Sequence, residues 1–112
     1  MARLRTSNGD VVCERCDIAS SPWARMRGLL GRSSLEPDEG MLFPHTGSIH
    51  MFFMRFPIDA IFCDRDLRVV KVVRGLPPWR TAAARGANVV IELADGAASG
   101  IDAGDHLVLE PT

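Results

Sequence analysis

The chain has 112 residues, of which 46% are hydrophobic and 24% charged, and its formal net charge is −1. This near-zero charge gives no positive field for a phosphate backbone, so nucleic acid is disfavoured as a partner. No apolar run approaches the roughly 18 residues that a membrane-spanning helix needs, and the first residues lack the apolar stretch of a signal peptide. The sequence therefore predicts one cytoplasmic domain, residues 1–112, without a membrane partner.

The chain begins with a signal for a β-hairpin. Asn8-Gly9-Asp10 separates the strand-forming stretches 4–6 and 11–13. An Asn-Gly pair favours the tight turns that join antiparallel strands, because both residues accept positive φ angles. We therefore expect residues 4–6 and 11–13 to pair with each other.

Three cysteines, Cys13, Cys16 and Cys63, form an odd set that does not suggest a disulfide framework and suits a reducing compartment. The Cys-x-x-Cys spacing of the first two also occurs in zinc sites and redox pairs. Zinc would need two more ligands with a suitable spacing, which the sequence does not offer. A thioredoxin-like pair would open a helix, whereas this pair lies in an extended stretch. We expect incidental thiols, no metal and no cofactor, with zinc and redox chemistry as lesser alternatives.

Residues 21–30 predict one short helix. Ser21 is a suitable N-cap, Pro22 suits the first helical position, and Gly31 is a typical C-terminal stop. Apolar side chains follow at helical spacing between them.

After a loop, the chain consists of short extended runs separated by turns. The runs are residues 41–43, 48–54, 57–63, 67–73, 87–93 and 106–110. Together with the hairpin they give about eight short strands and a single helix, which favours a mainly-β sandwich or barrel. The absence of alternating helices excludes a parallel α/β sheet.

The stretch SIHMFFMRFPID, Ser48 to Asp59, places polar groups among apolar ones. As a continuous strand it would have two apolar faces and keep His50 in dry surroundings. Pro57 predicts a bend. A carboxylate at Asp59 would be buried, and a buried carboxylate must be paired or protonated.

We expect Asp59 to be ionised and held by an arginine, with Arg55 first and the helix-region arginines Arg25, Arg27 and Arg32 second. An alternative interpretation is that Asp59 caps backbone amides at the bend and His50 is a satisfied core histidine. A metal at this cluster is a third, weaker interpretation.

Four segments in this order resemble one protein family: RMRGLLGRSSL, GMLF, HMFFMRFPIDAIFCD and VIELADGAASGIDAGDHL. The family is the domain of unknown function 192, also called uncharacterised protein family 0127, and the resemblance covers about residues 12–109. It implies a compact, jelly-roll-like β fold with one short helix and brings no established activity. Its motifs mark Arg25, Arg27, Arg32 and Glu92 as supporting residues. Met51 stands where similar sequences tend to carry Thr, which weakens any ligand or metal role for that position.

The first functional hypothesis is a small binding module without chemistry. Its pocket would be lined by His50, Met54, Arg55, Asp59 and Trp79. An arginine selects a carboxylate or phosphate through its planar fork, and a tryptophan offers a stacking face for a ring. The expected ligand is therefore an acidic small molecule or a sugar.

Two alternatives belong to other classes. A hydrolase- or lyase-like enzyme would use His50 as general base and Asp59 to orient it, although no nucleophile motif accompanies them. A protein-interaction module would expose Phe52, Phe53 or Trp79 in an apolar patch. The depth of any pocket around His50 discriminates between these alternatives.

Overall fold

The structure is a computed structural model that describes residues 2–19, 34–52 and 54–111. The described residues form nine strands and no helix. The helix predicted at 21–30, with Arg25, Arg27 and Arg32 in or beside it, lies outside the described residues. No helix with the length and apolar character needed to cross a membrane occurs in these described ranges.

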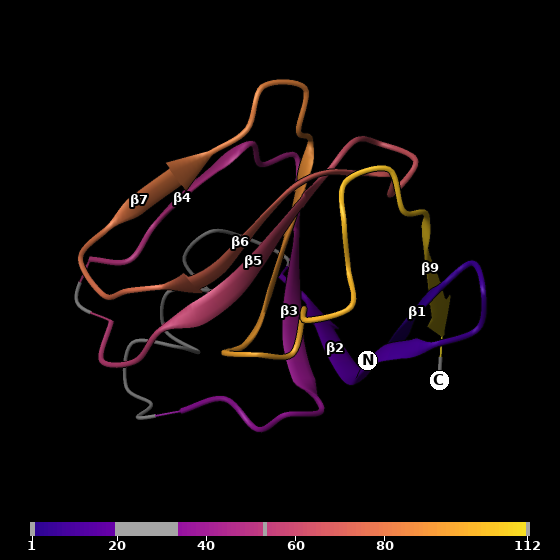
Figure 1. The fold of residues 1–112 in the computed structure, drawn as a ribbon, viewed down its shortest axis with the longest axis horizontal. Coiled ribbons are helices and arrows are strands. Elements are labelled where there is room, and N and C mark those ends of the chain that lie inside the picture. Colours follow the sequence, from indigo (N-terminus) through magenta and orange to yellow (C-terminus); the bar gives the residue numbers. More distant parts are fainter. Residues whose placement is uncertain (1, 20–33, 53, 112) are drawn as a thin grey trace.

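Seven strands form one sheet in the order β6-β5-β8-β3-β2-β1-β9, and β4 and β7 pair as a separate two-stranded ribbon. All neighbours are antiparallel except β2 and β3, which are parallel. The strands, labelled in Figure 1, are β1 Ala2–Thr6, β2 Val11–Ile18, β3 Glu39–Pro44, β4 Ser48–His50, β5 Ile58–Cys63, β6 Val69–Leu76, β7 Thr81–Ala83, β8 Val89–Ala94 and β9 Leu107–Pro111.

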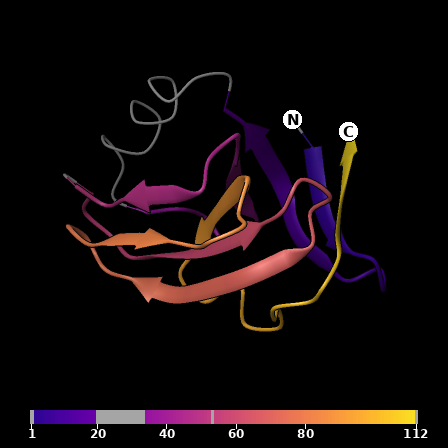
Figure 2. The same ribbon diagram turned by 90° about the horizontal axis from the view of Figure 1, so that it is seen from above.

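The predicted mainly-β class is confirmed. The large sheet curls into a half-barrel, and the ribbon lies beside β5 and β6 at one end of it (Figure 2). The strands do not divide into two sheets of similar size, so an open barrel describes the fold better than a sandwich.

The predicted hairpin is also confirmed. Strands β1 and β2 pair antiparallel around a turn in which Gly9 has a φ of 100°. The outer side of β1 pairs with β9, from Ala2 with Pro111 to Thr6 with Leu107. The first and last strands are therefore neighbours, and both termini lie at the same side of the molecule (Figure 2).

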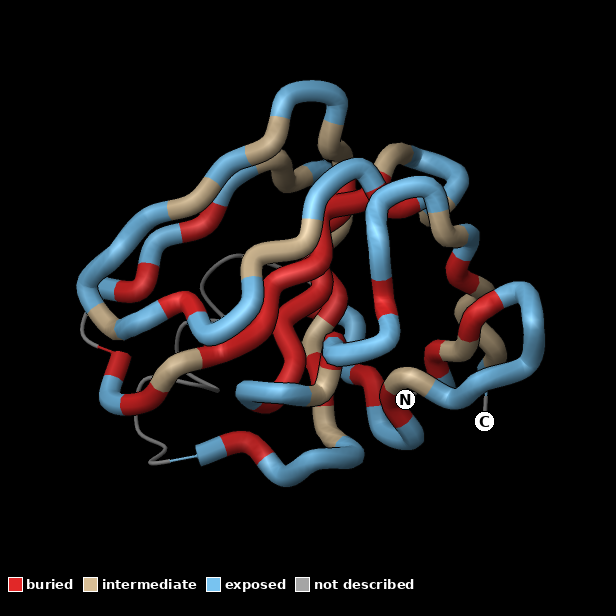
Figure 3. Tube along the Cα trace, viewed as in Figure 1, coloured by how far each residue is buried: buried red, intermediate tan, exposed pale blue. Residues whose placement is uncertain are grey.

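Strands β5 and β8 are the centre of the core, and every residue in both is buried (Figure 3). Because side chains alternate along a strand, the two faces of the sheet carry separate apolar clusters. One cluster contains Ile58, Ala60 and Phe62. The other contains Ile61 and Cys63 on the face that Asp59 shares.

The continuous strand predicted over residues 48–54 is wrong. Only Ser48–His50 is a strand, and its partner is the three-residue strand β7, which the sequence had placed in a loop. This small ribbon buries Ile49 but leaves Ser48 and His50 exposed. The expectation that His50 lies in dry surroundings is therefore wrong, because nothing in the described chain covers the outer face of the ribbon.

The core is closely packed where β3 lies between β2 and β8. A Cβ atom on Gly40 would lie 2.7 Å from the Leu93 Cδ2 and 2.9 Å from the Cys13 Sγ. Both distances are shorter than carbon or sulfur tolerates without movement. Gly40 therefore leaves room beside β3 for the Leu93 and Cys13 side chains.

We predict that Gly40→Ala lowers the free energy of unfolding by about 1–3 kcal/mol, the usual cost of overpacking a core. Gly100→Ala is the matched control, because its Cβ would meet nothing within 4 Å. Urea denaturation of the three proteins measures the difference. Equal midpoints for Gly40→Ala and Gly100→Ala would contradict this packing.

Candidate functional site

Asp59 is buried in β5 and is held by backbone amides. Its Oδ1 accepts a hydrogen bond from the Gly75 N–H at 2.9 Å. Its Oδ2 accepts two, from Gly96 at 3.1 Å and from Ala98 at 2.9 Å. The predicted burial of Asp59 is confirmed. Arg55 as its first partner is wrong, because Arg55 is exposed and the donors found among the described residues are these three amides.

Two of these donors are glycines in left-handed backbone conformations. Gly75 has a φ of 61° at the end of β6, and Gly96 has a φ of 92° just after β8. A left-handed residue directs its N–H away from the regular sheet ladder, where a side chain can accept it. The interpretation of Asp59 as an amide cap is therefore the better one, although the amides come from the end of β6 and the loop after β8 rather than from the bend. Asp59 thus joins the end of β6 to the loop after β8.

The other predicted site residues are dispersed. Met54 is part of the apolar cluster that contains Ile58, and Arg55 points to solvent. Glu92 is buried in β8 opposite Ala60, on the sheet face that Asp59 does not share. The structure therefore does not bring Met54, Arg55 and Asp59 together with His50 in one pocket.

An aromatic cluster does form around His50 and Trp79, with Phe52 between them. The rings of His50 and Phe52 lie 4.8 Å apart, and those of Phe52 and Trp79 stack at 6.2 Å. Phe52 is 42% exposed and Trp79 is 58% exposed. We name His50, Phe52 and Trp79 the aromatic platform.

The backbone holds this platform in a fixed arrangement. The Trp79 N–H donates to the Met51 carbonyl, and the Met51 N–H donates to the Arg80 carbonyl, both at 2.7 Å. Trp79 itself has a φ of 71°, a conformation that costs a residue with a Cβ atom about 1–3 kcal/mol. Strain of this kind persists only where the surrounding structure enforces it. The loop therefore keeps an exposed indole ring in place at an energetic cost.

A shallow cleft of about 490 Å³ continues from the platform through His50. The Lys71 Nζ donates to the Ala83 carbonyl at 2.9 Å, which fixes the ammonium at its edge. The Phe52 N–H donates to the His50 Nδ1 at 3.4 Å, so in the neutral imidazole the proton is on Nε2. The lining residues are Ser48, Ile49, His50, Lys71, Thr81, Ala82 and Ala83.

The sequence did not identify Lys71 and Thr81 as parts of this cleft. Lys71 belongs to β6 and Thr81 to β7, and they meet only because the ribbon folds back beside the large sheet. Lysine side chains are almost never fully buried, which is the one signal that the sequence offers for Lys71.

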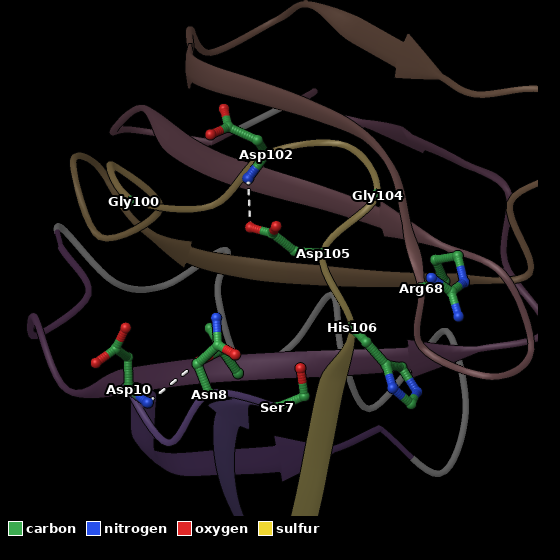
Figure 4. A pocket seen from close by; sticks show the side chains of 10 residues that line it. Ser7, Asn8, Asp10, Arg68, Gly100, Asp102, Gly104, Asp105 and His106 are labelled. Carbon is green, nitrogen blue, oxygen red and sulfur yellow. Dashed lines mark hydrogen bonds between the residues drawn. The ribbon is translucent and has the colours of Figure 1, made fainter.

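A second cavity, of about 400 Å³, lies between the β1–β2 turn and the loop before β9 (Figure 4). Its lining is almost entirely polar, but the polar groups make hydrogen bonds within or between the turns to which they belong. The Asp105 carboxylate accepts the Asp102 N–H at 2.9 Å, and the Asp102 carboxylate points away from it. The His106 Nε2 bonds to the Asp66 carbonyl at 2.8 Å. In the described ranges no three His, Cys, Asp or Glu side chains gather to hold a metal ion.

The sequence matches the family profile of DUF192, described as "Uncharacterized ACR", over residues 3–109. The chain belongs to the DUF192 family. A curated relative, the UPF0127 protein of Thermococcus sibiricus (strain DSM 12597 / MM 739), is 34% identical over 94 residues. That match covers 80% of this chain and 60% of the relative, so the chain spans less than two thirds of the relative's length.

Two crystal structures resemble this DUF192 chain closely. A Sinorhizobium meliloti 1021 protein described as a candidate transcription regulator has a TM-score of 0.80 at 26% identity, covering 96% of this chain and 91% of its own. A protein of unknown function from Novosphingobium aromaticivorans DSM 12444 has a TM-score of 0.78 at 26% identity, covering 96% and 82%.

We predict that Asp59→Ala lowers the free energy of unfolding by about 3–5 kcal/mol, because it leaves three amide donors without an acceptor. Asp59→Asn keeps the shape but turns one acceptor into a donor, so it should cost about 1–3 kcal/mol. Asp95→Asn, an exposed neighbour of Gly96, is the control and should stay within about 0.5 kcal/mol of the parent. Chemical denaturation at neutral pH measures all three. An Asp59→Ala variant as stable as the parent would contradict the role of this carboxylate.

Proposed function

We propose that this DUF192 protein is a small-molecule-binding module that stacks a ring of its ligand on the aromatic platform. The observation that supports this function is Trp79, which is largely exposed, stacked on Phe52 and held in a left-handed conformation. More than half of the indole surface is exposed, and its left-handed backbone conformation lowers stability. A gain from ligand contact explains why such a residue is kept in place.

The adjacent cleft determines the charge of the proposed ligand. Its polar lining comprises the Lys71 ammonium, the His50 Nε2–H and the Ser48 and Thr81 hydroxyls, and none of its lining residues is Asp or Glu. One Lys71 proton is used by the Ala83 carbonyl, which leaves two for a ligand. A site rich in donors and without carboxylates favours an acidic group. The ligand is therefore a ring that carries a carboxylate, either a sugar acid or an aromatic acid.

The enzyme alternative loses support because Asp59 accepts three amide hydrogen bonds and lies on a buried sheet face, where it cannot orient the exposed His50. The description of the Sinorhizobium meliloti relative suggests a regulator, and a regulator that senses a small acid would be consistent with this site. Direct binding to DNA is disfavoured by the net charge of −1.

The test is a titration of isotope-labelled protein, followed by NMR, with matched pairs of ligands. Glucuronate is compared with glucose, and benzoate with benzyl alcohol. We expect amide shifts at residues 48–52, 71 and 79–83, with the acid of at least one pair binding more tightly than its neutral partner. Shifts elsewhere, or no shifts with any member of the panel, would contradict the proposal.

We predict that Trp79→Gly reduces the affinity for the bound acid by about tenfold or more, which corresponds to about 1.4 kcal/mol. The same variant should unfold within about 0.5 kcal/mol of the parent, because glycine adopts the left-handed conformation without strain. Val11→Ala, which truncates an exposed side chain on β2, is the control for both measurements. Unchanged affinity in Trp79→Gly would show that the aromatic platform does not bind the ligand.

We predict that Lys71→Met weakens binding of the acid by about tenfold and leaves the neutral analogue unaffected. The methionine retains the apolar stem of the lysine, so the platform and the cleft shape persist. Equal losses for acid and neutral analogue would indicate that Lys71 contributes shape and not charge.

A further inference from the structure

Cys13 and Cys16 lie on the same buried face of β2 because the strand contains a β-bulge. Leu4 pairs with Cys13 and Ala2 with Cys16, so three steps along β2 match two steps along β1. In a regular strand, residues three apart point to opposite faces, and one extra residue brings them to the same face. Their exposed fractions are 1% and 0%, and both belong to the same apolar cluster.

Each of the two thiols has the largest single effect on the pKa of the other. The hydrogen bond from Cys16 lowers the pKa of Cys13, to which the backbone N–H of Arg15 contributes as well. The same contact, together with burial, raises the pKa of Cys16. Burial, together with the nearby Asp64 carboxylate, raises the pKa of Cys63, the third cysteine, to about 12. Cys13 and Cys16 therefore form an interacting pair on one buried face of β2.

We propose that Cys13 and Cys16 form a two-coordinate site for a soft monovalent metal ion of the copper(I) type. Thiolate ligands select such ions over harder ones, and a two-coordinate ion needs only this pair. Tetrahedral zinc would require further ligands, and the described residues group no third His, Cys, Asp or Glu with the two thiols. The site uses the one Cys-x-x-Cys motif of the chain, which the ligand-binding cleft does not involve.

The geometry favours a bridging ion over a disulfide. Three residues of regular strand span roughly 10 Å between Cα atoms, and a bulge shortens this only in part. A disulfide needs Cα atoms within about 7 Å, so it would force the backbone of β2 to move. An ion placed between the sulfurs adds two metal–sulfur bonds of about 2.3 Å, the length known for zinc thiolates. It can therefore join side chains that a direct sulfur–sulfur bond cannot.

An entry route lies at the turn before β3. The Cys13 thiol donates to the Asp38 carbonyl at 3.4 Å, so this turn covers the sulfur. The turn is held to β2 by an exposed ion pair between Arg15 and the Asp38 carboxylate, at 2.9 and 3.0 Å. Exposed ion pairs contribute little to stability, and uncovering the sulfur also breaks the hydrogen bond at 2.9 Å from the Arg15 N–H to the Asp38 carbonyl. The ion displaces two thiol protons into solvent, and no electron is transferred.

The test uses reduced full-length protein under anaerobic conditions. Copper(I) is supplied with a chromophoric chelator that competes for it, and bound copper is measured from the chelator's absorbance. We expect one equivalent per chain, two protons released on binding, and loss of this equivalent in Cys13→Ala and in Cys16→Ala. Cys63→Ala is the matched control, since it removes a buried thiol from the same apolar cluster and should keep the equivalent.

Three results would overturn the site. The first is loss of the copper equivalent in Cys63→Ala. The second is its retention in the Cys13→Ala, Cys16→Ala double variant. The third is that the parent binds copper(I) no more tightly than free thiols do. X-ray absorption of the copper-loaded parent decides the matter if a variant fails to fold. Two sulfur neighbours support the site, and nitrogen, oxygen or a third sulfur contradict it.

Discussion

The arrangement of the large sheet depends on one carboxylate that has no charged partner in the described chain. Asp59 gathers three N–H groups, from the end of β6 and from the loop after β8. A buried carboxylate is costly to desolvate, and three well-aligned amides offset that cost because each directs a partial positive charge at it. The two left-handed glycines are stable for the same reason, since their amides have a strong acceptor. One side chain thus sets the ends of two strands and the path of a loop.

The two faces of the large sheet differ in how their polar groups are used. The face that carries Asp59 is closed by the loop between β8 and β9, so its polar groups are used within the fold. The β4–β7 ribbon, in contrast, covers its cluster with one face only and leaves the other to solvent. A binding site on the ribbon is compatible with this fold, because substitutions on the exposed face of the ribbon do not disturb the amides around Asp59.

Local signals in the sequence were sufficient for the hairpin at Gly9, for the alternation of β5 and for the burial of Asp59, since each depends on neighbouring residues. The partners of Asp59 could not be predicted, because a backbone N–H has no residue identity and any residue type can supply it. The ribbon was missed because Thr81–Ala83 lacks the large apolar residues that mark a strand. The bulge that brings Cys13 and Cys16 to the same face depends on how β1 and β2 pair, and the spacing of the cysteines does not predict this pairing.

The pairing of β1 with β9 has a consequence for the order in which the chain can fold. Strand β1 meets β2 within a few residues, but its other edge pairs with residues 107–111 at the far end of the sequence. During synthesis, that edge has no partner until the last strand leaves the ribosome. An unpaired strand edge invites association with other chains, and contacts between distant residues form slowly. The alternating Arg3 and Arg5 on β1, each paired with a glutamate once folded, place charge on the strand during that interval.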